Sequence, residues 1–165
     1  MLKIKLLILF FSFLVLSSCG MKLKDNDDKF SIEYLSGGQN AYIFKNILTQ
    51  QLIANNMYDI NSNNIISISM NENKEYQSAS ITKVATRKLN QLKIKIKTYN
   101  NKNDKCILFN EEYNSKQSFL LANSSANLSN LAAESDILLI NSENISLEII
   151  DDLLLNPNNE CAALE

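Results

Sequence analysis

A cluster of basic side chains in the middle of the sequence has the spacing best suited to binding chemistry. Lys83, Arg87 and Lys88 stand close together, and Arg87 is the only arginine in the chain. A guanidinium group suits bidentate contact with a phosphate or a carboxylate. The cluster therefore predicts contact with an anion, although an ordinary charged hairpin tip that keeps a sheet edge soluble has the same pattern.

A second basic pattern alternates with aliphatic residues. The residues concerned are Leu92, Ile94 and Ile96, each followed directly by a lysine, at 93, 95 and 97. Successive side chains of a strand point to opposite faces, so this spacing predicts a half-buried strand. The lysines are then either the solvent face of that strand or a positive stripe that meets the polar interior of a partner or an anionic glycolipid.

The residue types that catalysis and metal binding require are scarce. The chain contains no histidine, which removes Ser-His-acid and Cys-His sites and the commonest metal ligand. Its glycines are Gly20, Gly37 and Gly38, too few and too scattered for a phosphate-cradling loop. The adjacent carboxylates at 111–112 and 151–152 diverge on a strand or a helix, and we interpret both pairs as solvated charges. We therefore expect no enzyme activity, no metal and no cofactor other than a covalently attached lipid, argued below.

The first 18 residues have the layout of a secretory signal peptide. Lys3 and Lys5 precede an apolar run over residues 6–16, and the small residues Ser17 and Ser18 follow it. This run is shorter than the roughly 20 apolar residues that a membrane-spanning helix needs. The sequence therefore predicts a cleaved signal over residues 1–18 rather than a retained transmembrane anchor.

The residues around the predicted cleavage site, Leu16-Ser17-Ser18-Cys19, resemble the bacterial lipobox. The resemblance implies that Cys19 carries a thioether-linked lipid and becomes the mature N-terminus, with enough acyl chains for stable anchoring. Gly20 follows in place of an aspartate, which in bacterial lipoproteins usually means release to the outer membrane. We expect a protein anchored by lipid to the periplasmic side of the outer membrane.

The mature chain is acidic and contains two further cysteines. Removing the signal takes away two lysines and no acids, so the net charge changes from −2 to −4, which argues against nucleic acid as a partner. Cys106 and Cys161 would lie in an oxidising compartment, where they could pair. The alternative is a core thiol and a separate thiol in the tail.

Alternation of apolar and polar residues predicts four strands. They are expected over residues 30–35, 66–80, 92–97 and 105–119, and the last contributes Cys106, Leu108 and Tyr113 to the core. A turn at residues 100–104 joins the last two strands as a hairpin.

Helical spacing predicts two helices. The first starts at Asn40 as its N-cap and runs to about Asn55. The second ends before Pro157, with a break allowed near Asn141. Its apolar stripe contains Leu128, Leu131, Ala132, Ile137, Leu138, Ile145, Ile149 and Leu153. We interpret Glu134 and Asp136 as charges favoured by the helix dipole.

The element order β-α-β-β-β-α predicts a single α+β domain over residues 30–156. We expect a four-stranded, mainly antiparallel sheet with two helices packed on one face. A polar tether at residues 19–29 precedes this domain, and a disordered tail at 157–165 follows it.

Short motifs in this order resemble the lipopolysaccharide-assembly lipoprotein LptE in its alphaproteobacterial form, over essentially the whole mature chain. They are Cys19-Gly20, Ala85-Thr86-Arg87-Lys88-Leu89, Ser118-Phe119 and the run from Asn127 to Asp136. The resemblance implies a non-enzymatic plug within the LptD β-barrel that helps lipopolysaccharide reach the outer leaflet. It also implies basic residues at the tip between the second and third strands, a place that Lys83 and Arg87 match.

Two other functions compete with this interpretation. An independent periplasmic lipid-binding lipoprotein would need an apolar cavity. A membrane-anchored hydrolase would need a catalytic cluster of serine, lysine and acid groups without histidine.

Overall fold

The computed structural model describes residues 28–78, 85–101, 106–121 and 127–155. The predictions for the signal peptide, Cys19, the tether up to residue 27, Lys83, Cys161 and the tail lie outside these residues. The elements are β1 (Phe30–Ser36), α2 (Gln39–Ala54), β2 (Asn64–Ser78), β3 (Ala85–Asn100), β4 (Cys106–Leu120) and α3 (Asn127–Leu155).

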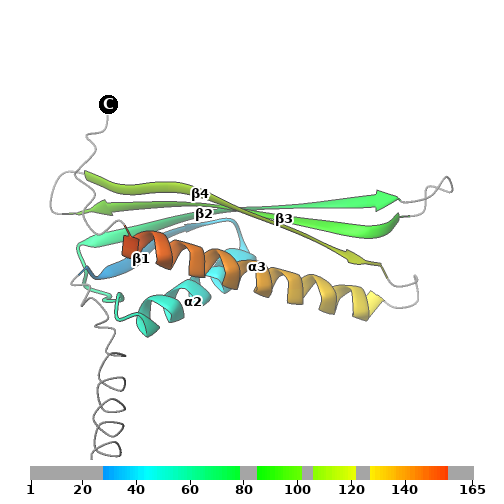
Figure 1. Ribbon diagram of the computed structural model, residues 1–165, viewed down its shortest axis with the longest axis horizontal. Coiled ribbons are helices and arrows are strands. Elements are labelled where there is room, and N and C mark those ends of the chain that lie inside the picture. Colours follow the sequence, from blue (N-terminus) through cyan, green and yellow to red (C-terminus); the bar gives the residue numbers. More distant parts are fainter. Residues whose placement is uncertain (1–27, 79–84, 102–105, 122–126, 156–165) are drawn as a thin grey trace, which may run out of the picture.

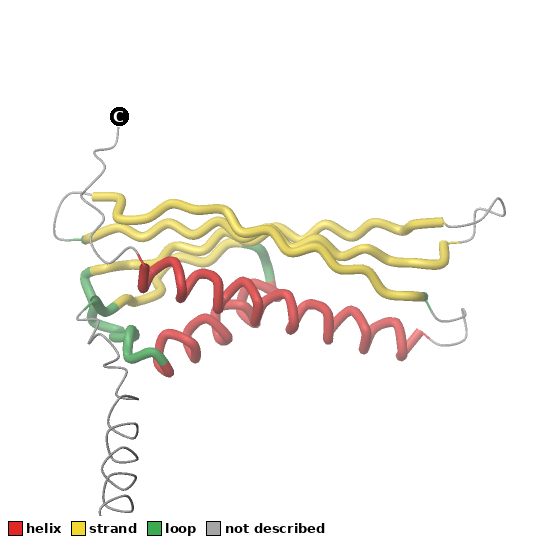
Figure 2. Tube along the Cα trace, viewed as in Figure 1, coloured by secondary structure: helices red, strands yellow, loops and turns green. Residues whose placement is uncertain are grey.

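The six elements form a two-layer α+β sandwich. The sheet has the order β1-β2-β3-β4, with β1 parallel to β2 and the other neighbours antiparallel. Both helices lie on the same face of this sheet (Figures 1 and 2). The fold class and the element order predicted from the sequence are confirmed.

The core lies between the helices and the central strands. Leu92, Ile94 and Ile96 of β3 are fully buried, and the three lysines between them are exposed, as the alternation predicts. Phe44 and Leu48 of α2 pack into the same cluster. These aliphatic and aromatic side chains leave water together, and their burial is the main favourable term in folding.

Near the start of β4 the prediction that Leu108 belongs to the core is wrong. The pairing of β3 with β4 shifts between Thr98 and Tyr99, so that Phe109 faces Thr98 and Ile107 faces Tyr99. Such a bulge places one extra residue on a strand and redirects the side chains that follow. Phe109 is therefore buried, whereas Leu108 is only partly buried.

The connection between β1 and α2 uses backbone conformations that favour glycine. Gly37 has φ +122° and Gly38 has φ +74°, and a Cβ on Gly37 would meet the carbonyl oxygen of Met70 at 2.4 Å. The helix starts directly after Gly38 without a side-chain cap. The prediction that Asn40 is the N-cap is therefore wrong, because these glycines set the turn and Asn40 instead donates a hydrogen bond of 2.8 Å to Glu72.

Three strands and one helix extend well beyond the rest of the molecule. β1 has 7 residues and α2 has 16, whereas β2 to β4 have 15 or 16 each and α3 has 29. We call the projecting part the distal arm; it comprises residues 70–78 of β2, 85–94 of β3 and 113–120 of β4, which lie beyond the end of β1 in register, together with the first half of α3 (Figure 1).

The first turns of α3 expose two leucines of the predicted stripe. Leu128 is 83% exposed and Leu131 is 61% exposed. Both belong to the same helix stripe as Ile145, Ile149 and Leu153, which are buried. The predicted buried stripe is thus correct from Ile137 onward and wrong for Leu128, Leu131 and Ala132. The helix also runs through Asn141 without a break.

Candidate functional site

The sheet face opposite the helices carries a broad polar surface centred on the lysines of β3. Residues that pair directly in neighbouring strands share a face. The rows of this outer face are Ser67-Lys97-Asn110, Ser69-Lys95-Glu112 and Asn71-Lys93-Asn114. Ser36, Ser67, Ser69, Lys95 and Lys97 line a shallow hollow of about 290 Å³. This surface can form hydrogen bonds and ion pairs with another polar surface.

The predicted anion cluster does not assemble as one site within the described residues. Arg87 is exposed and faces Gln77 and Leu120 across the sheet. Lys88 is buried on the other face, because neighbouring residues of a strand point in opposite directions. Arg87 is therefore available to a ligand, whereas the ammonium group of Lys88 is directed into the protein.

Lys88 and Lys74 form an ion-pair cluster with Glu134 of α3. Lys88 Nζ donates to Glu134 Oε1 and lies 5.0 Å from the centre of the Tyr76 ring. Lys74 Nζ lies 3.1 Å from Glu134 Oε2 and 3.2 Å from Glu72 Oε1. The cluster joins the first half of α3 to β2 and β3.

The charges in this cluster change one another's pKa. Burial by itself raises the pKa of Glu134, but the hydrogen bonds from Lys88 and Lys74 outweigh burial and hold it below its ordinary value. Burial likewise lowers the pKa of Lys88, but the hydrogen bonds and charges of Glu134 and Tyr76 together outweigh burial, so that its pKa is raised. All three groups are thus stabilised in their charged forms.

Sequence analysis missed this role of Glu134. The helix dipole alone gives Glu134 and Asp136 the same interpretation, but only Glu134 meets the lysines. An acid and a base many residues apart in sequence carry no local signal for their pairing.

The environment of Asp152 also differs from the prediction that this side chain is a solvated charge. It is partly buried, and its Oδ2 accepts a hydrogen bond of 2.6 Å from the hydroxyl of Tyr113 in β4. Burial and the neighbouring Asp152 carboxylate raise the pKa of Tyr113 well above its usual range. This contact joins the second half of α3 to the sheet.

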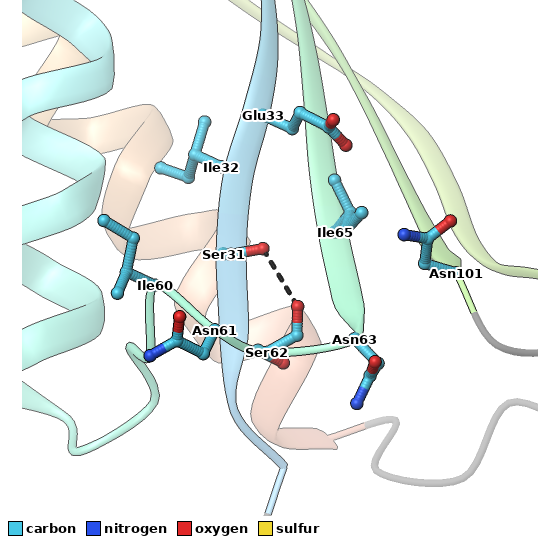
Figure 3. A pocket seen from close by; sticks show the side chains of 9 residues that line it. All are labelled: Ser31, Ile32, Glu33, Ile60, Asn61, Ser62, Asn63, Ile65 and Asn101. Atoms are coloured by element: carbon cyan, nitrogen blue, oxygen red, sulfur yellow. Dashed lines mark hydrogen bonds between the residues drawn. The ribbon is translucent and has the colours of Figure 1, made fainter.

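A second hollow of about 350 Å³ lies beside β1, at the end of the sheet where β2 starts (Figure 3). Its lining includes Glu33 and the side chains of Asn61, Asn63 and Asn101. Ser31 Oγ donates to the carbonyl oxygen of Ser62 at 3.3 Å across it. These groups suit a neutral polar molecule, and nothing in the sequence pattern of this loop pointed to a hollow here.

The structure shows for one of the two cysteines whether its thiol is free or forms a disulfide. Cys106 is buried and disulfide-bonded, so its interpretation as a free core thiol is wrong. The partner cysteine lies outside the described residues, and the pairing with Cys161 stays a prediction.

The described residues form neither a membrane-spanning helix nor a metal-binding cluster. No helix there combines the length and the apolar content that a membrane span requires. The same residues contain no group of three or more cysteine, aspartate or glutamate side chains arranged to hold a metal ion.

The fold matches solved structures of bacterial lipoproteins. Rare lipoprotein B of Shewanella oneidensis matches with a TM-score of 0.59 at 10% identity, over 78% of this chain and 98% of that one. The chain has the rare lipoprotein B fold. A minor lipoprotein of Acinetobacter baumannii matches with a TM-score of 0.64 at 14% identity, over 82% and 97%. Lipoprotein B of Nitrosomonas europaea matches with a TM-score of 0.53 at 14% identity, over 74% and 79%.

The match in fold is not accompanied by a match in sequence. No protein-family model matches the chain, and no curated protein matches it. Proteins with the rare lipoprotein B fold can therefore differ from this chain at nearly every position. The three structures belong to lipoproteins, the class that residues 16–19 predict for this chain.

Proposed function

We propose that this chain is a lipoprotein, anchored to the outer membrane through Cys19, that acts as plug and assembly partner of an LptD-type β-barrel. In this role it helps lipopolysaccharide reach the outer leaflet. The role is one of binding and scaffolding, and no catalytic step is assigned to the chain. The lipobox and the rare lipoprotein B fold support the proposal together.

The open sheet face is the observation that carries the barrel partnership. Its three strands present serines, asparagines, lysines and a glutamate in continuous rows. The interior of an outer-membrane barrel is polar, because lumen-facing and lipid-facing residues alternate along each strand. A polar sheet face that the helices leave uncovered can make hydrogen bonds across such an interior.

The hollows favour this role over that of an independent lipid carrier. A carrier needs an apolar cavity for acyl chains. The hollow beside β1 is lined by three isoleucines together with amide, hydroxyl and carboxylate groups, and the hollow beside Lys95 is lined by serines and lysines. Neither offers an apolar chamber.

A pull-down from detergent-solubilised membranes tests the partnership. We expect the tagged native chain to recover one large β-barrel. Changing Lys93, Lys95 and Lys97 together to glutamine should reduce that recovery, and Lys45→Gln, on α2 of the helix layer, should leave it unchanged. Absence of a barrel from the native sample, or equal recovery with the triple variant, would contradict the proposed surface.

A second experiment tests the anchor separately. Cys19→Ala should leave the precursor uncleaved and mislocalised, because no lipid can be attached. Mass spectrometry of the N-terminus and membrane fractionation measure both effects. Normal processing of this variant would remove the lipoprotein assignment, whatever the pull-down shows.

A further inference from the structure

The outer edge of β4 is a long strand edge for which the described residues provide no neighbour. β4 is the last strand of the sheet and has 15 residues, whereas β1 at the opposite edge has 7. The β1 edge is also partly covered, since Phe30 exchanges backbone hydrogen bonds with Met57 and Asp59. An open edge presents a row of backbone donors and acceptors that can pair with another strand.

The sequence of β4 is complementary to itself when it is read in the opposite direction. Placing Asn114 opposite the Asn114 of a second, antiparallel copy sets Glu112 against Lys116 on both sides of the centre. The same register sets Phe109 against Phe119 and the exposed Glu111 against Gln117, and it brings Leu120 to the bulge at Leu108. Opposite charges and apolar pairs directly across two strands stabilise their pairing.

Neighbouring registers lose this complementarity. A shift of two residues in one direction sets Glu112 against Asn114 and Phe109 against Gln117. The same shift in the other direction sets Glu112 against Ser118 and Asn110 against Leu120. A shift of one residue pairs the helix-covered face of one sheet with the outer face of the other. The register centred on Asn114 is therefore the one that matches charge, apolar character and face together.

This register also covers an apolar residue that the monomer leaves exposed. Leu120 is 70% exposed at the end of β4. Its neighbour Phe119 is only partly buried. Both gain an apolar partner from the second copy, which transfers apolar surface out of water.

We infer that two copies of this chain pair through the outer edges of their β4 strands, antiparallel and centred on Asn114, to give one continuous eight-stranded sheet. Such a pair is isologous, because the same edge serves both copies around a two-fold axis. The inference does not rest on the barrel partnership and concerns the purified chain without a barrel.

Charge reversal tests the register on the mature lipidated chain in detergent. Sedimentation of the unchanged protein should show a dimer. Lys116→Glu or Glu112→Lys each places like charges opposite one another at two positions and should raise the dissociation constant by about tenfold. The double variant Glu112→Lys/Lys116→Glu restores opposite charges and should restore the dimer. A monomer at every concentration, or a double variant as weak as either single one, would overturn the inference.

A cross-linking pair tests the centre of symmetry and uses variants that disturb no charge. Asn114→Cys brings two thiols together at the axis, and a short bismaleimide should join them. Asn110→Cys is the matched control, since it lies on the same face and is exposed, while its two copies would be about 27 Å apart. Equal cross-linking of both variants, or none with Asn114→Cys, would exclude this register. Thermal melts of the two variants verify that both are folded.

Discussion

Glu134 of α3 accepts a hydrogen bond from Lys88 of β3, a residue 46 positions earlier in the chain. The same carboxylate pairs with Lys74 of β2. Farther along α3, Ile145 and Ile149 are buried in the apolar core. Ion pairs thus add to the apolar packing of α3 only in its first half, around Glu134.

Glu134→Gln should destabilise the protein by roughly 1 to 3 kcal/mol, because the buried ammonium group of Lys88 loses its charged partner and Lys74 keeps only Glu72. Urea denaturation measures this change in the free energy of unfolding. The matched control is Asp136→Asn, an exposed acid two residues away, which should stay within about 0.5 kcal/mol of the native protein. Equal effects of the two changes would contradict the cluster's role.

The same cluster gives the protein an acid-sensitive contribution to stability. The pKa of Glu134 is lowered in the folded state, so its contribution is present above the ordinary value of 4.5 and is lost as the pH falls through the lowered pKa. Glu134→Gln should therefore flatten the fall in stability on the acid side, as followed by denaturation at a series of pH values.

Tyr113 gives the opposite dependence at alkaline pH. Its pKa is raised in the folded state by burial and by Asp152, so the folded protein retains the hydroxyl proton that the unfolded chain loses. This contribution is complete below the ordinary value of 10.0 and declines as the pH rises above it. Tyr113→Phe should lower stability at neutral pH by about 1 kcal/mol and reduce its alkaline decline. An unchanged alkaline limb would show that the Tyr113 hydroxyl contributes nothing to it.

Gly37→Ala should destabilise the protein more than Gly38→Ala. Both positions have a positive φ, so a side chain adds backbone strain of about 1 to 3 kcal/mol at either one. Only at Gly37 would the added carbon also collide with the Met70 carbonyl oxygen. Thermal melting of the two variants measures the difference, and a Gly37→Ala protein as stable as Gly38→Ala would rule out the close approach.

Cys161 should be the disulfide partner of Cys106. The chain has three cysteines, and a lipid thioether on Cys19 leaves that sulfur unable to form a disulfide. Cys161→Ser should therefore release one thiol at Cys106, detected by alkylation of the unfolded protein and peptide mass spectrometry. A peptide that joins Cys106 to Cys19 in the native protein would contradict both this pairing and the lipid anchor.

Arg87→Glu should weaken binding of lipopolysaccharide about tenfold if the exposed guanidinium contacts a lipid phosphate, because a charge-assisted hydrogen bond is replaced by repulsion. Lys88 is not expected to add a contact, since its ammonium group is bound to Glu134. Binding is measured with purified lipopolysaccharide, and Lys45→Glu on α2 controls for the change in net charge. Unchanged binding would return Arg87 to the role of a solubilising charge at the sheet edge.

Local patterns in the sequence determined the type and order of the elements. The alternation of Leu92, Ile94 and Ile96 with lysines predicted a strand and its buried face. Spacing of three and four residues predicted both helices. These periods follow from the geometry of the backbone itself, so they can be recognised without knowing any neighbour.

Only the tertiary structure decided which parts of those faces meet another element. At 1.5 Å per residue, α2 spans about 24 Å and α3 about 43 Å, so α2 cannot cover the whole of its longer neighbour. Leu128 therefore remains exposed while Leu153, on the same stripe, is buried. Lys88 pairs with Glu134 rather than with Asp136 for the same reason, because the pairing depends on which side chain the tertiary structure brings within reach. Periodicity fixes a direction around a helix, whereas the partner found in that direction depends on residues far away in the chain.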